Sequence, residues 1–72
     1  MREYLIRIVE ARPFIPFTLL LQGGHVIDVL SKEFISLEEA VTMATVYDPA
    51  GHRYYIDVDR IVALKTIHPV ED

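Results

Sequence analysis

The chain has no cysteine and no tryptophan, and only two of its 72 residues are serine. Without cysteine it can form neither a disulfide nor a cysteine-based metal site. An excess of positive charge is also missing, since seven Lys and Arg residues stand against 11 Asp and Glu residues, which gives a formal net charge of -4. The broad basic field that attracts proteins to nucleic acids or anionic membranes is therefore excluded, although a small basic patch is compatible with this composition.

Long uninterrupted hydrophobic segments are missing as well. The longest apolar stretch runs over residues 14–21 and is broken by Pro16 and Thr18, so it falls short of the roughly 18 residues that span a bilayer. The amino-terminal apolar stretch is interspersed with charged residues, whereas the core of a secretory signal peptide is uncharged. We therefore expect a cytoplasmic protein.

Enzyme signatures are absent from the sequence too. It has no glycine-rich phosphate loop, no nucleophile elbow, no His-Glu-x-x-His motif and no cysteine nucleophile. A barrel of this size, filled by its own side chains, would have little room for a ligand pocket of roughly 300 Å³ or more. We expect no enzyme, no cofactor, no catalytic residue and no metal site.

Branched aliphatic residues are abundant instead. Ile, Leu and Val make up 23 of the 72 residues, and 51% of all residues are hydrophobic, which is typical of a chain that folds. The length fits a single domain over residues 1–72. Because a domain of this size buries only about 60% of its extended-chain surface, some hydrophobic side chains should stay exposed, and this predicts a homo-oligomer.

The first residues have the periodicity of an amphipathic helix, which we expect over about residues 2–12. At about 100° per residue, apolar and charged side chains gather on opposite arcs. Pro13 should end the helix, because proline has no amide hydrogen and pushes the preceding residue out of the helical conformation. The apolar arc consists of Met1, Tyr4, Leu5, Ile8, Val9 and Ala11.

From Phe17 onward, β-branched and aromatic residues alternate with others in the manner of antiparallel strands. If the two adjacent glycines belong to a three-residue turn, Phe17 pairs with Val29 and Leu19 with Ile27. A two-residue Gly-Gly turn would instead put Leu19 opposite Asp28 on the face that holds Phe17. The three-residue turn is therefore the prediction.

Three hydrophobic residues lie outside the core that this pattern defines. Ile6 falls toward the charged side of the helix, and Leu20 and Val26 lie on the face of the hairpin away from Phe17. We interpret these residues as candidate contacts between subunits.

The middle of the chain is harder to assign. Residues 33–35 could continue the second strand after a bend or form a short irregular crossing, and both alternatives bury Phe34. Residues 36–39 fit the spacing of a helical capping box, but residues 41–47 are rich in strand formers. Although turn, helix and strand all stay open for residues 37–42, we favour a turn followed by a strand.

The clearest local signal is Asp48-Pro49-Ala50-Gly51, which has the residues that a type I turn prefers at its first, second and fourth positions. This turn should join the strand before it to an antiparallel strand at about residues 53–58. A tight connection at residues 57–60 then leads to the last strand, at residues 61–67.

These elements predict a mainly β fold in which an N-terminal helix precedes five antiparallel strands. The arrangement is that of a small SH3-like or Sm-like barrel. We expect the barrel over about residues 14–67 and a short tail at residues 68–72.

Several short motifs resemble a family of small uncharacterised bacterial proteins, over roughly residues 12–67. The chain departs from the family pattern in the first turn, where Gly23 replaces Asp, and at Lys32, which replaces Pro. The resemblance implies no activity. The motifs are Arg12-Pro13-Phe14-Ile15-Pro16-Phe17, Gly24, Glu33-Phe34-Ile35, Tyr47-Asp48 with Gly51, and Ile56-Asp57 ahead of Ile61.

The chain is more remotely similar in architecture to Sm-like proteins, which place a helix before five bent strands and assemble into rings through strand edges. Sm-type RNA sites have an Arg-Gly or Lys-His pair in the last hairpin. Here that place holds Asp57, Asp59 and Arg60, so the similarity does not extend to RNA binding of that kind.

Three groups of residues could carry chemistry. Phe14 and Phe17, flanked by prolines, fit a core cap better than an exposed proline-rich ligand. Arg53 and Tyr55 should share one face of a strand and form a possible nucleic-acid patch. Asp48, with the carboxylates at residues 57 and 59, could form a weak cation site, but we favour their capping of backbone amides. The histidines lack ligand spacing and should be solvated.

We therefore expect a non-catalytic interaction module that assembles with itself through strand edges and presents a surface to a protein partner. An Sm-like RNA-binding regulator is the alternative, although RNA is not the favoured partner. A ligand or metal binder at a subunit interface is the third hypothesis.

Overall fold

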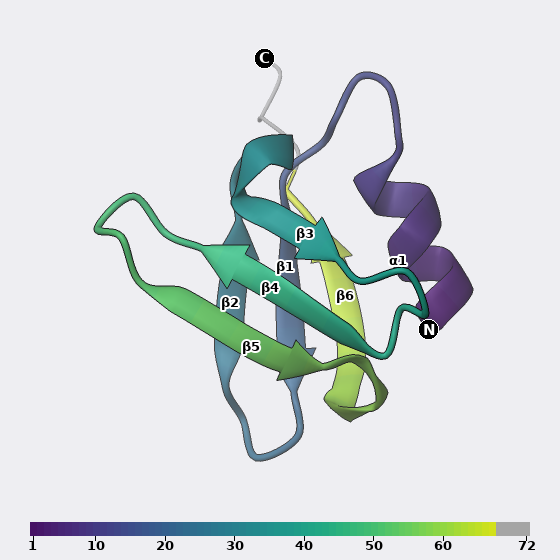
Figure 1. Ribbon diagram of the computed structural model, residues 1–72, viewed down its shortest axis with the longest axis vertical. Helices are drawn as coiled ribbons and strands as arrows, with labels where there is room; N and C mark the ends of the chain where they lie inside the picture. The colour runs from purple at the N-terminus through teal and green to yellow at the C-terminus, as the bar shows by residue number, and fades with distance from the viewer. Residues whose placement is uncertain (68–72) are drawn as a thin grey trace.

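The computed structural model describes residues 1–67 and consists of one helix followed by six β-strands in that part of the chain (Figure 1). Two short 3-10 turns, η1 (Lys32–Phe34) and η2 (Val58–Arg60), connect strands. The other elements are α1 (Arg2–Val9), β1 (Phe17–Leu21), β2 (Val26–Val29), β3 (Ile35–Leu37), β4 (Met43–Tyr47), β5 (Arg53–Asp57) and β6 (Ile61–Thr66).

The strands form two antiparallel sheets with the orders β2-β1-β6 and β3-β4-β5. In Figure 1 the strands of the second sheet run diagonally across those of the first. The mainly β fold with an N-terminal helix is confirmed, whereas the five-stranded SH3-like or Sm-like barrel is not: six strands form two separate antiparallel sheets within residues 1–67. η1 interrupts the chain after β2 and redirects it, so that Ile35 can pair with Val46 in the other sheet and form the additional strand β3.

Helix α1 is shorter than expected and ends at Val9. Its last backbone hydrogen bond joins Glu10 N to Ile6 O, and the chain leaves the helix before Arg12, the residue that Pro13 disfavours in a helix. Leu5, Ile8 and Val9 are buried, as predicted, whereas Met1 and Tyr4 are about half exposed. Within residues 1–67 no helix is both long and apolar enough to cross a bilayer.

The first hairpin has the predicted register. Phe17 pairs with Val29 and Leu19 with Ile27, and Leu21 N donates to His25 O across the turn. Gly23 and Gly24 have φ values of +88° and +89°, a conformation in which other residues are strained. The three-residue turn is therefore confirmed.

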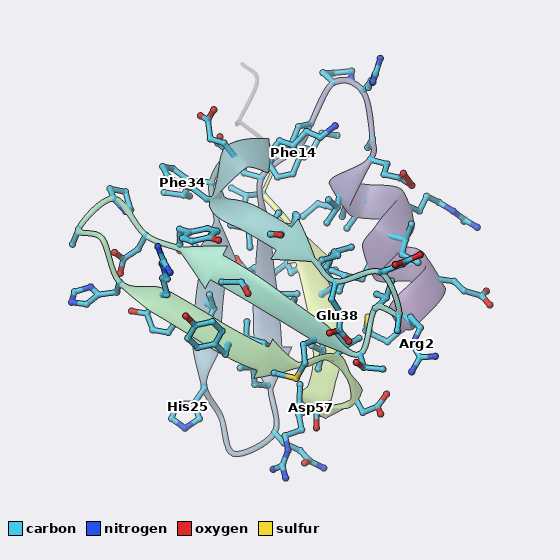
Figure 2. All side chains as sticks on the ribbon, in the orientation of Figure 1. Arg2, Phe14, His25, Phe34, Glu38 and Asp57 are labelled. Carbon is cyan, nitrogen blue, oxygen red and sulfur yellow. The ribbon has the colours of Figure 1, made fainter. Side chains whose placement is uncertain are left out.

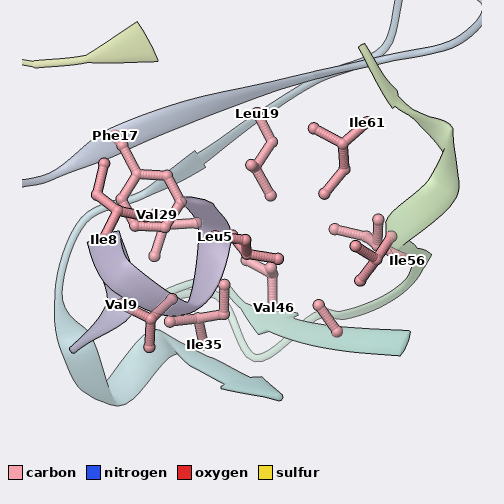
Figure 3. Packing of buried hydrophobic residues seen from close by; sticks show 12 residues of the cluster. Leu5, Ile8, Val9, Phe17, Leu19, Val29, Ile35, Val46, Ile56 and Ile61 are labelled. Carbon is pink, nitrogen blue, oxygen red and sulfur yellow. The ribbon is translucent and has the colours of Figure 1, made fainter. Parts of the chain in front are cut away.

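Both sheets and the helix contribute to one core, which Figure 3 shows from close by. Phe14 packs against it, with its ring centroid 5.8 Å from that of Phe17, so the expected packing role of these two rings is confirmed. The buried cluster consists of Leu5, Ile8, Val9, Phe17, Leu19, Val29, Ile35, Ala44, Val46, Ile56, Val58 and Ile61.

Candidate interaction surfaces

The outer face of the sheet β2-β1-β6 brings two of the predicted contact residues together. Leu20 on β1 is flanked by Val26 on β2 and Ala63 on β6. We call these three residues the apolar row. Val26 is 61% exposed, and Ala63 is exposed as well. Ile6 is partly buried on α1 and does not belong to this row.

A second row on the same face is polar. Thr18 on β1 is flanked by Asp28 on β2 and Lys65 on β6, and we call these three residues the charged row. Thr18 Oγ1 donates a hydrogen bond of 2.8 Å to Asp28 Oδ1. The charged row thus has a carboxylate at one margin of the sheet and an ammonium group at the other.

A cleft lies between β2 of one sheet and β5 of the other. It has a volume of about 620 Å³ and adjoins a smaller hollow of about 220 Å³ that also borders Ile27 and Tyr54. The prediction of a small pocket-forming capacity concerned the interior of the domain, whereas this cleft lies at the surface between the two sheets. The β2–β5 cleft is lined by Leu21, Gln22, His25, Val26, Ile27, Arg53, Tyr54, Tyr55, Ile56, Asp57 and Arg60.

The possible nucleic-acid patch lies on β5, where side chains alternate between the two faces of the sheet. The Arg53 guanidinium lies 5.6 Å from the ring centroid of Tyr47, its cross-strand partner on β4. Tyr55 is 68% exposed. Arg53 and Tyr55 occupy alternate positions of β5, opposite Tyr47 and Thr45 of β4, and therefore share one face as predicted, while Tyr54 Oη donates to Asp48.

The turn after β4 is organised by Asp48. Its carboxylate accepts hydrogen bonds from His52 N (2.9 Å) and Tyr54 Oη (3.2 Å), and it lies 3.0 Å from His52 Nδ1. The backbone hydrogen bond from His52 is the main cause that lowers the pKa of Asp48 below its ordinary value of 3.8. The same carboxylate raises the pKa of Tyr54, chiefly because the phenol donates a hydrogen bond to it. The turn is thus held by a carboxylate that favours its ionised state.

The remaining two aspartates of the possible cation site lie elsewhere. Asp57 Oδ1 accepts a hydrogen bond from Asp59 N, and Asp57 Oδ2 lies 3.7 Å from Arg60 Nε. Asp48 follows one end of the β4–β5 ladder, and Asp57 pairs with Met43 at the opposite end. The hypothesis that the three aspartates form one cation site is therefore wrong, and capping of backbone amides by residues 48 and 57 is confirmed.

Acidification should reveal the role of Asp48. Because the pKa of Asp48 is lowered in the folded state, its contribution to the free energy of unfolding is present above the unfolded pKa and is lost as the pH falls through the folded pKa. We expect Asp48→Asn to reduce the loss of Tm between about pH 6 and about pH 3. Glu39→Gln is the control, since that exposed carboxylate has no hydrogen bond or ion pair within the described residues. An unchanged pH dependence in Asp48→Asn would contradict this prediction.

The sequence carries no local signal for this cleft. Its walls come from strands of different sheets, and no local pattern indicates which edges will face each other. His25, in the β1–β2 turn, lies far from Arg53 in the sequence, whereas Arg60 follows Arg53 by only seven positions. Figure 2 shows His25 and Asp57 at the same end of the molecule, where both line the cleft.

Comparison with known proteins adds no family to these observations. No protein-family model, curated protein or solved structure matches this chain significantly.

Proposed function

We propose that this protein is a non-catalytic interaction module that self-associates through the outer face of the sheet β2-β1-β6. The observation that carries the proposal is the apolar row, in which Leu20, itself partly buried, lies between the exposed residues Val26 and Ala63. Exposed contiguous apolar surface on a small domain is typical of an interaction site. The row would be covered when two such faces pack against each other.

This face is complementary to itself. A two-fold axis parallel to β1 places β2 of one copy over β6 of the other, so that Asp28 of each copy faces Lys65 of the other. Leu20 then meets the Leu20 of the second copy, and Val26 meets Ala63. The two charged pairs and the apolar contact arise together only with this orientation of the axis. The same surface patch then complements itself on both copies, as in an isologous interface.

The strand edges are a less favourable route to self-association. The free edge of β5 carries Arg53 and Asp57, and β6, at the margin of its sheet, carries Lys65. Charged residues on an edge strand oppose pairing with another strand of the same kind. We therefore place the contact between copies on the sheet face rather than at the edges predicted from the sequence.

The expected dimer is weak. The face is only three strands wide. We expect it to bury less than the roughly 800 Å² per partner of a standard stable interface. We expect a dissociation constant of about 10 μM or weaker, which corresponds to about -7 kcal/mol. Such a contact supports reversible assembly.

Charge reversal tests this arrangement by sedimentation equilibrium over a wide concentration range. Asp28→Lys and Lys65→Asp should each weaken dimerisation at least about tenfold, because each puts like charges opposite each other twice. The double variant Asp28→Lys/Lys65→Asp should restore affinity to within about threefold of the wild type. Because Asp28 also accepts the Thr18 hydrogen bond, Tm is measured for every variant.

Two results would reject the proposal. One is a wild-type protein that stays monomeric at millimolar concentration. The other is a double variant that dimerises no better than the two single variants while all three are folded.

RNA binding is the second candidate function, supported by Arg53 and Tyr55 of β5. Arg53 stacks on Tyr47 and has no ion pair within residues 1–67, and Tyr55 is the most exposed aromatic ring there. A cation next to aromatic rings is the combination that binds single-stranded nucleic acid. An RNA titration forms one arm of the experiment described next.

A further inference from the structure

The edge of β5 that borders the β2–β5 cleft has free backbone groups. Hydrogen bonds from Asp48 N to His52 O and from Val58 N to Thr42 O mark the pairs that are bonded across the β4–β5 ladder. Because bonded and non-bonded pairs alternate in an antiparallel ladder, the N–H and C=O groups of Arg53, Tyr55 and Asp57 are directed to the free edge. An extended segment can pair with these groups as an additional strand.

The cleft beside this edge can receive alternate side chains of such a segment. Its apolar lining comes from Leu21, Ile27 and Ile56, which belong to both sheets. Successive side chains of a strand point to opposite faces, so every second residue of a segment on β5 would point toward this lining. The cleft therefore favours a segment in which apolar residues alternate with polar ones.

The charge of the cleft favours an acidic segment. The lining includes two guanidinium groups, those of Arg53 and Arg60, but only one carboxylate, that of Asp57. This carboxylate already accepts the backbone N–H of Asp59 and lies near Arg60, whereas Arg53 has no ion pair within the described part of the chain. In a chain with a net charge of -4, the cleft is a local site of positive charge.

From these observations we infer that the β2–β5 cleft binds an extended acidic peptide of a partner protein, which pairs as a strand with the free edge of β5. A peptide fits this edge better than RNA, because an RNA strand has no alternating N–H and C=O groups to pair with Arg53, Tyr55 and Asp57. The inference is independent of self-association, which uses the outer face of the other sheet.

The test separates backbone pairing from side-chain contact. Tyr55→Pro removes one N–H from the free edge without removing a ladder hydrogen bond, since that N–H does not face β4. Tyr55→Ala keeps the N–H and removes the ring. The probe is a fluorescein-labelled peptide in which Val alternates with Thr after two Glu residues, and its binding to the full chain is followed by fluorescence anisotropy at low salt. The chain is titrated from concentrations below those at which it associates, and its folding is checked by circular dichroism.

We expect Tyr55→Pro to bind the peptide at least about tenfold more weakly than Tyr55→Ala, a difference of about 1.4 kcal/mol. Arg53→Gln should weaken binding severalfold, and a matched peptide with Lys in place of Glu should bind at least about tenfold more weakly than the acidic one.

Three results would overturn the inference. Folded Tyr55→Pro could bind as well as Tyr55→Ala, or the Lys peptide could bind as well as the Glu peptide. In the third, a labelled oligouridine binds in a salt-dependent manner while the acidic peptide does not, which would favour the RNA candidate.

Discussion

Replacement of Phe17 by alanine should leave a large fraction of the protein unfolded at room temperature. The Phe17 side chain is completely buried in the core cluster that both sheets and the helix share. Truncation of a buried phenylalanine costs about 3–5 kcal/mol, and the total stability of single domains is only about 5–15 kcal/mol, with small domains near the lower limit. Urea denaturation followed by circular dichroism measures the change in the free energy of unfolding.

Phe14→Ala provides the matched control. Phe14 contacts the Phe17 ring at a centroid distance of 5.8 Å but is only partly buried at the margin of the core. Because less apolar surface is lost and water can fill the space, we expect a cost of about 1–2 kcal/mol. Equal losses for the two variants would show that Phe17 does not occupy the core as described.

The success of the hairpin prediction has a local cause. The glycines fix the turn, the alternation of apolar residues fixes the face, and Phe17 and Val29 meet only 12 positions apart in the chain. The strand β3 was not predicted because three residues give too short a pattern. Its pairing with β4 depends on the direction that the chain takes after η1, which the residues of β3 do not determine.

For the candidate surfaces too, contacts that are close in the sequence could be predicted, whereas contacts between distant segments could not. Leu20 and Val26 could be predicted as neighbours because the hairpin register places them side by side. Ala63 and Lys65 join them only through the pairing of β1 with β6, which connects distant parts of the chain. The β2–β5 cleft depends on how two sheets cross, so only the three-dimensional structure reveals it.

Leu5→Ala should destabilise the whole domain rather than α1 alone. An isolated helix of eight residues is not stable in water, so α1 depends on packing, and Leu5 is its only completely buried residue. We expect a loss of about 3 kcal/mol in the free energy of unfolding. Tyr4→Ala, which alters a residue that is 48% exposed, should cost less than about 1 kcal/mol. Alanine is the best helix former, so helix propensity favours both variants and the difference between them reports packing against the sheets. If Leu5→Ala abolished only the helical circular dichroism signal and left the transition of the sheets unchanged, α1 would be an independent appendage and not part of the core.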